Sequence, residues 1–241
     1  MMKRSLALGA LMAFVITGSA MAAEVMVDPY SSENDVTLEY LHPGDDVTTY
    51  ADVCALGHNT DINVEALNIY VTGLDDYGVH IWGDKSTVTM SAVNELEINK
   101  DVYATANETT ITLNGNIVNV EGNLNIDGYG TKSKIEINGG ETTIEGNLYA
   151  TGDETQIIVK GSDVKINGGV ESKGIGSVVS IYGNDITVGT TVWAENGNGG
   201  SVINLGSSEK GSVVSISDVN TMKRSLEQLN ECLSLYPKDF F

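Results

Sequence analysis

The chain has few basic residues and few aromatic residues. Lysine and arginine together number 13, against 33 aspartate and glutamate residues, which gives a formal net charge of −20 at pH 7. Negative charge of this size opposes binding to nucleic acids and to anionic membrane surfaces. Aromatic residues make up only 6% of the chain, so a hydrophobic core must be mainly aliphatic.

Proline and cysteine are also scarce. The three prolines all lie outside the repetitive middle of the chain: Pro29, Pro43 and Pro237. This matters because a proline inside a strand removes a hydrogen bond of the sheet. The two cysteines, Cys54 and Cys232, stand near opposite ends of the chain. In a stack of strands about 4.8 Å apart they would exceed the ~7 Å limit of a disulfide, so we expect Cys54 to be free or linked to another chain.

Long apolar runs are confined to the first 22 residues. Lys3 and Arg4 precede an apolar stretch, and Ala20-Met21-Ala22 offers a small-x-small cleavage site. This order is typical of a secretory signal peptide, so residues 1–22 are predicted to direct export. No later run is long enough to form a transmembrane helix.

A serine or threonine recurs every 22 to 26 residues through the middle of the chain. The members of this hydroxyl column are Thr60, Ser86, Thr109, Ser133, Thr155, Ser177 and Ser201. Apolar residues follow at the second and fourth positions, as Ile157 and Val159 follow Thr155. A period of this length combined with alternation at every second residue is typical of a solenoid built from strands, with one coil per repeat.

Two further sets of alternating positions flank the hydroxyl column in each repeat. One precedes it, as Val102 and Ala104 precede Thr109, and the other follows it, as Val164 and Ile166 follow Thr155. Each coil therefore has three strands with inward apolar residues. We predict an all-β fold, a right-handed parallel β-helix of about seven three-strand coils.

Glycines mark the corner after the first strand of most repeats: Gly57, Gly83, Gly128, Gly152 and Gly174. We expect a positive φ at these corners, because glycine, which has no Cβ, adopts it without steric strain.

The pattern changes at both ends of the repeats, which sets the predicted boundaries. Residues 23–52 contain acidic clusters and only weak alternation, and we expect an N-terminal cap there over the first coil of a solenoid spanning 53–217. In the tail, 218–241, apolar residues recur at helical spacing. A short amphipathic helix over 220–236 is expected to close the solenoid.

The signal peptide and two of the coils that follow it resemble a known family. The two coils are Val102-Tyr-Ala-Thr-Ala-Asn-Glu-Thr-Thr-Ile-Thr-Leu-Asn-Gly and Leu148-Tyr-Ala-Thr-Gly-Asp-Glu-Thr-Gln-Ile-Ile-Val-Lys-Gly. They resemble the passenger domains of autotransporter and haemagglutinin-type bacterial surface adhesins. The resemblance covers roughly residues 53–217 and rests on periodicity and composition. It implies a right-handed parallel β-helix that attaches to host or neighbouring cells and lies at the cell surface, outside the cell or in the periplasm of a bacterium.

The resemblance departs from that family at the C-terminus. An autotransporter carries an outer-membrane barrel of many strands, each of about 9–11 residues. The 24 residues after Ser217 cannot supply one. The sequence therefore indicates either a passenger without its barrel or a stand-alone exported β-helix.

An outward position in the first strand is aromatic in alternate coils: Tyr103, Tyr149 and Trp193. Two strand spacings separate successive members, roughly 10 Å along the solenoid. Aromatic side chains combine a large apolar face with a polar handle, so this row is a candidate glycan-binding site. The alternative is that aromatic residues simply favour exposed strand positions.

Carboxylates recur at a different corner, eight residues after the hydroxyl column: Glu141, Asp163 and Asp185. In three successive coils they would stack about one strand spacing apart. Such a ladder of oxygen ligands suits calcium, and the alternative is a set of solvated turn residues. Calcium is the only cofactor that the sequence suggests.

Enzymatic sites are not evident in the sequence. A polysaccharide lyase needs a strong cation near the reacting bond, but Arg224 is the only arginine after the signal peptide. A glycosidase needs paired carboxylates about 5–9.5 Å apart across a cleft, and no long loop is present to build one. The histidines His42, His58 and His80 lack zinc spacing and are expected at the surface or in the cap.

These observations favour a non-enzymatic adhesin or surface-interaction module. Its expected partner is a glycan or protein on a host or neighbouring cell. A carbohydrate-active β-helix enzyme, either a lyase or a hydrolase, is the alternative.

Overall fold

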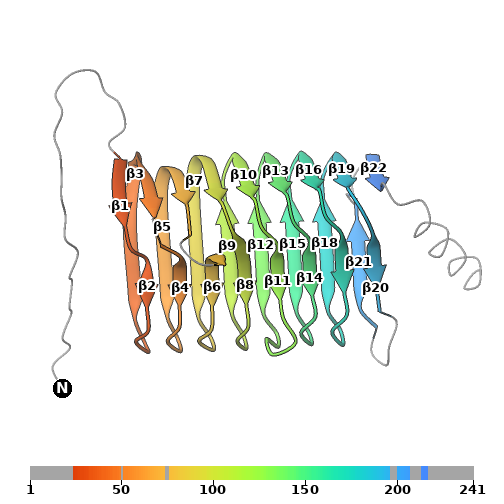
Figure 1. The fold of residues 1–241 in the computed structure, drawn as a ribbon, viewed down its shortest axis with the longest axis horizontal. Helices are drawn as coiled ribbons and strands as arrows, with labels where there is room; N and C mark the ends of the chain where they lie inside the picture. The colour runs from red at the N-terminus through yellow and green to blue at the C-terminus, as the bar shows by residue number, and fades with distance from the viewer. Residues whose placement is uncertain (1–23, 50, 74–75, 196–199, 207–212, 217–241) are drawn as a thin grey trace, which may run out of the picture.

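The computed structural model describes residues 24–49, 51–73, 76–195, 200–206 and 213–216, which form a parallel β-solenoid (Figure 1). About eight turns stack along one axis. The fold class predicted from the repeats is confirmed. The expected C-terminal helix and the signal peptide lie outside the described residues.

One side of the solenoid is a sheet of eight parallel strands, one from each turn. In spatial order these are β2 (Tyr30–Ser31), β4 (Val53–Ala55), β6 (Tyr77–Ile81), β8 (Asp101–Ala104), β11 (Leu124–Ile126), β14 (Leu148–Ala150), β17 (Val170–Ser172) and β20 (Val192–Ala194).

The remaining strands form a 14-stranded sheet that divides into two branches. It begins with β1 (Glu24–Val27), β3 (Thr37–Thr49), β5 (Asp61–Val71) and β7 (Thr87–Ile98). The first half of β7 pairs with β9 (Thr110–Asn114) and the second half with β10 (Ile117–Val120). One branch continues through β12 (Lys134–Asn138), β15 (Gln156–Lys160), β18 (Val178–Tyr182) and β21 (Val202–Leu205), and the other through β13 (Glu141–Ile144), β16 (Asp163–Ile166), β19 (Asp185–Val188) and β22 (Val213–Ile216).

The sheet divides into two branches only after β7, so the expected three strands per coil are not present in every turn. From β8 onward each turn does have three strands, but in the earlier turns the second and third expected strands are one long strand. The extra residue of the β7 repeat is accommodated as a bulge, where Leu67 of β5 lies opposite both Val93 and Asn94. A bulge bends a strand without ending it, so β7 remains one strand across the extra residue.

The segment expected to form an N-terminal cap has the structure of a further turn. Strands β2 and β3 pair in parallel with β4 and β5, which brings the total from the seven expected coils to about eight. On its outer side this turn has only β1 among the described strands, and β1 pairs with Asp46–Thr49 of β3 and not with the first half of that strand. Its inward residues Leu38 and Tyr40 are therefore only partly buried against the core.

The core lies inside the turns and is aliphatic, as the low aromatic content predicts. The inward residues of the middle turns are almost fully buried, and Ile157 and Val159 of β15 have no exposed surface. Towards the last turn the inward side chains become half-buried, as at Leu205 and Ile216.

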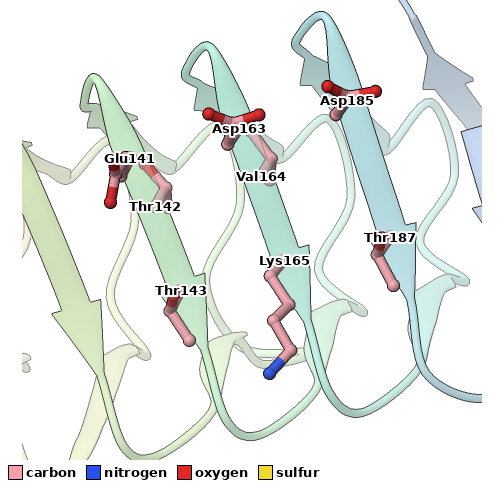
Figure 2. Close-up of a pocket in the computed structure, with 8 residues that line it drawn as sticks. All are labelled: Glu141, Thr142, Thr143, Asp163, Val164, Lys165, Asp185 and Thr187. Carbon is pink, nitrogen blue, oxygen red and sulfur yellow. The ribbon is translucent and has the colours of Figure 1, made fainter. Parts of the chain in front are cut away.

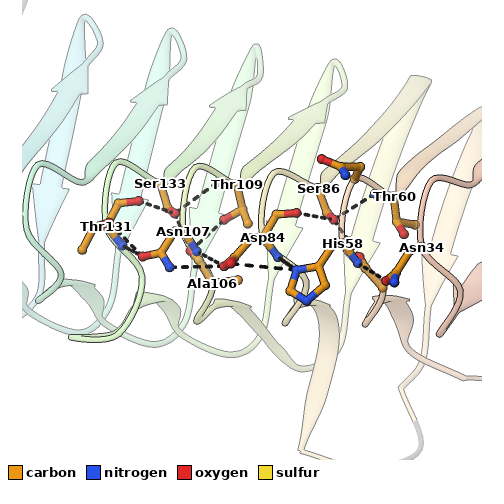
Figure 3. Close-up of polar contacts among 12 residues, drawn as sticks. Asn34, His58, Thr60, Asp84, Ser86, Ala106, Asn107, Thr109, Thr131 and Ser133 are labelled. Carbon is orange, nitrogen blue, oxygen red and sulfur yellow. Dashed lines mark hydrogen bonds and ion pairs between the residues drawn. The ribbon is translucent and has the colours of Figure 1, made fainter.

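The hydroxyl column lies in the interior of the corner that follows the eight-stranded sheet (Figure 3). The Ser86 Oγ donates a hydrogen bond to the Gly57 carbonyl (2.9 Å) and accepts one from the Thr60 backbone N–H (3.0 Å), both in the preceding turn. Ser133 repeats this with the Ala106 carbonyl (2.6 Å) and the Thr109 N–H (3.2 Å). A buried corner leaves backbone groups that need partners, which explains why a hydroxyl recurs in every turn.

A second ladder of polar contacts runs along the outside of the same corner (Figure 3). The His58 N–H donates to Asn34 Oδ1, the Asp84 N–H donates to His58 Nδ1, and the Asn107 N–H donates to Asp84 Oδ1, at 2.8 to 3.0 Å. Asn107 Oδ1 in turn accepts from the Thr131 N–H (3.1 Å). These side chains link successive turns and have a structural role.

The corner glycines do not have the expected positive φ. Positive φ occurs instead directly before the hydroxyl column. Five of these residues are not glycine and have φ of 52 to 57°: Asn59, Lys85, Glu108, Lys132 and Glu154. In two later turns the same position is a glycine, Gly176 (68°) or Gly200 (48°). Glycine is required for a different reason. A Cβ at Gly83 would lie 1.9 Å from the Gly57 carbonyl oxygen of the preceding turn, so a side chain at Gly83 would clash with the backbone of that turn.

Candidate functional site

The outer face of the eight-stranded sheet holds the aromatic row. Its members share one column, because Tyr103 is in register with Asn125, Asn125 with Tyr149, Tyr149 with Glu171, and Glu171 with Trp193. The three aromatic residues therefore lie two strands apart, as their spacing in the sequence indicated.

Tyr103 differs from the other two because one face of its ring is already in contact with protein. Tyr77 stacks on it with ring centroids 5.0 Å apart and an interplanar angle of 10°. The Tyr103 hydroxyl donates to Asp127 Oδ2 (2.7 Å), and its pKa is raised, first by burial and then by this hydrogen bond. Tyr103 is therefore less available as a stacking platform than the sequence alone suggested.

Trp193, on β20, is the most exposed member of the row, with 44% of its surface accessible. The Lys173 Nζ lies 5.0 Å from the centroid of its ring. Lys173 also bonds to Glu171, and this hydrogen bond raises the pKa of the lysine. Tyr149, on β14, is half-buried. Around Trp193 an aromatic face thus adjoins one acidic and one basic group.

Other aromatic residues lie near this row that the sequence pattern did not select. Trp82 is 51% exposed and its ring lies 5.6 Å from that of His80. Tyr77 lies edge-on to His80 at 5.1 Å. The alternation pattern missed Tyr77 because it precedes a bulge in β6, where Gly78 interrupts the register with β8.

The acidic corner is formed by the first residues of three adjacent strands (Figure 2). Glu141, Asp163 and Asp185 are in direct register on β13, β16 and β19. They line a shallow groove together with Lys165, which lies between Thr143 and Thr187 in the next outward column. Figure 2 shows the three carboxylates along one edge of this groove and Lys165 further down the strand.

Metal binding at this corner stays a prediction. Among the residues that the structure describes, no group of three or more His, Cys, Asp or Glu side chains is arranged to hold a metal ion. The carboxylates of successive turns are exposed to solvent, which is also what the alternative of solvated turn residues requires.

The expected surface position of the histidines is confirmed for His58 and is wrong for His80. His58 is exposed and belongs to the corner ladder, with 59% of its side-chain surface accessible. The expectation of a surface or cap position is wrong for His80, which is only 8% exposed. His80 contacts the buried thiol of Cys54, which forms no disulfide with any described residue. The sequence does contain a signal for this contact, because the two residues occupy the same outward column one coil apart.

In the described part of the chain, no helix has the length and apolar character needed to cross a membrane. No protein-family model, curated protein or solved structure matches this chain.

Proposed function

We propose that this protein is a non-enzymatic surface-interaction module that binds a neutral glycan along the outer face of its eight-stranded sheet. The observation that supports this most directly is the shared column of Tyr149 and Trp193 on strands of a rigid solenoid. Platforms repeated along the axis suit a linear polymer that lies along the same axis. Aromatic faces supply the apolar surface on which sugar rings stack.

The charge of the chain narrows the class of glycan. With a net charge of −20, the protein repels polyanions over distances of roughly 8 Å at physiological salt. An uncharged polysaccharide or oligosaccharide avoids this repulsion. Glu171, beside Trp193, is placed to accept hydrogen bonds from sugar hydroxyl groups.

The proposal includes export and adhesion. It rests on the sequence of residues 1–22 and on the resemblance to surface adhesins, and the solenoid is compatible with a passenger-like β-helix. Fractionation of the producing cell and N-terminal sequencing of the mature chain test the export step. Recovery of uncleaved protein from the cytoplasm would contradict it.

The binding step is tested by incubating purified protein with a glycan array and measuring affinity for each retained glycan. Trp193→Ala should weaken binding more than tenfold, because truncating an aromatic anchor costs about 2 kcal/mol or more. Tyr129→Ala is the matched control, since Tyr129 is 82% exposed but lies outside the row. Equal loss in both variants, or no binding by the parent protein, would refute the proposal. Release of reducing sugar or unsaturated product would instead favour the carbohydrate-active enzyme.

A further inference from the structure

Three side chains that the glycan proposal does not use meet on the first turns of the solenoid. Cys54 lies on β4, His80 lies on the adjacent β6, and Asp52 directly precedes β4. The Cys54 Sγ is 2.7 Å from His80 Nε2, and His80 Nδ1 is 3.6 Å from Asp52 Oδ2. The order is a nucleophile, a base and a carboxylate that orients the base.

Aromatic rings hold the imidazole in place. Tyr77 contacts it edge-on at 5.1 Å with an interplanar angle of 73°, and Trp82 contacts it at 5.6 Å. Tyr77 is itself stacked on Tyr103. Cys54 is 1% exposed and His80 8% exposed, so the thiol and the imidazole form a shielded pair with a fixed orientation.

The protonation states follow from the surroundings. Burial, and to a lesser extent the charge of Asp52, raises the pKa of the Cys54 thiol to about 12. At neutral pH the thiol is therefore protonated, and it donates to His80 Nε2. The imidazole proton then resides on Nδ1, on the side of Asp52. A nucleophile of high pKa reacts in such an arrangement because the base removes its proton during the attack, as in hydroxyl-based triads.

We propose that Cys54, with His80 as base and Asp52 as the residue that positions His80, is a thiol site that small peroxides oxidise. The sulfur attacks one oxygen of hydrogen peroxide while His80 takes the thiol proton. The O–O bond breaks, the departing oxygen receives that proton from His80 and leaves as water, and the sulfur loses two electrons. The product is Cys54 sulfenic acid. Because Cys54 is only 1% exposed, we expect the site to react with small peroxides and to be shielded from bulky electrophiles.

The test compares the native protein with the same protein unfolded in urea. Hydrogen peroxide is added, sulfenic acid is trapped with a cyclic 1,3-dione, and peptide mass spectrometry gives the oxidation rates of Cys54 and, as an internal reference, Cys232. A base-assisted thiol should react at least tenfold faster in the native protein than in the unfolded one. A bulky maleimide should show the opposite order at Cys54. If peroxide oxidises Cys54 no faster in the native protein than in the unfolded one, the thiol is simply buried and the proposal is overturned.

Variants separate the roles of the base and the positioning residue. His80→Asn should lower the peroxide rate at Cys54 by about 10²-fold or more, the usual contribution of a general base. Asp52→Asn should lower it less, and Asp52→Glu should restore part of that loss, which a purely structural role would not do. His42→Asn is the control and should leave the rate unchanged. If His80→Asn reacts as fast as the parent while melting at the same temperature, His80 is not the base and the proposal fails.

Discussion

Thr142 occupies an inward position of β13 at which the neighbouring turns place Val118 and Val164. It is 1% exposed, and its hydroxyl has no hydrogen-bond partner among the described residues. Valine has nearly the same shape without the hydroxyl. A buried polar group without a partner costs about 1–3 kcal/mol, so Thr142→Val should raise the free energy of unfolding by about that amount.

The same substitution at Thr155 should have the opposite sign. Thr155 is fully buried, but its Oγ1 donates to the Gly152 carbonyl at 2.7 Å. Valine would remove this hydrogen bond and leave the carbonyl without that donor. We expect Thr155→Val to lower the free energy of unfolding by about 1–3 kcal/mol.

Thermal unfolding followed by circular dichroism measures both effects, with about 2–4 °C expected for each kcal/mol in a chain of this size. Urea unfolding checks whether the two variants unfold with the same denaturant dependence, because turns of a solenoid can unfold separately. Opposite shifts of the melting temperature would support the reasoning. A lower melting temperature for Thr142→Val, or shifts of the same sign, would refute it.

Three further predictions concern the turn stacking, the acidic faces and calcium. Gly83→Ala should destabilise the protein by several kcal/mol, since its Cβ would lie 1.9 Å from a backbone oxygen. Gly128→Ala is the control, because the nearest backbone oxygen would lie 4.0 Å from its Cβ. In the same urea assay this control should be close to neutral. Burial, and then nearby carboxylates, raise the pKa of Glu97, so the folded state loses stability as pH rises from the unfolded pKa through the raised one. Glu97→Gln should therefore raise the melting temperature at pH values above that pH range and leave it unchanged at pH values below the range. An increase in melting temperature that is the same at every pH would contradict this. If the acidic corner binds calcium, millimolar calcium should raise the melting temperature and Asp163→Asn should abolish the increase; an unchanged curve would identify these residues as solvated turn acids.

Periodicity in the sequence was sufficient to predict the class of fold and the register of the middle turns. Each coil repeats the same inward positions, and a shift of one residue would turn the aliphatic side chains of a strand such as Lys134–Asn138 to the solvent. The register of Tyr103, Tyr149 and Trp193 follows directly from this constraint. The same constraint placed Glu141, Asp163 and Asp185 in one column.

The features that depend on contacts between turns were decided only by the tertiary structure. The corner glycines suggested a positive φ, but the close approach of a backbone oxygen from the preceding turn is what requires Gly83. β7 continues through its bulge as one strand that pairs with both branches of the sheet, and no local pattern distinguishes such a bulge from a loop.

By itself, the sequence determined the side of the sheet on which the residues of the regular repeats lie, because alternation fixes side-chain direction wherever no bulge interrupts the strand. It did not determine which outward side chains contact one another. Tyr77 stacks on Tyr103 across a bulge, and the Lys173 ammonium lies over the Trp193 ring. Such contacts depend on rotamers and on the spacing of neighbouring turns, and these are fixed only when the turns pack together.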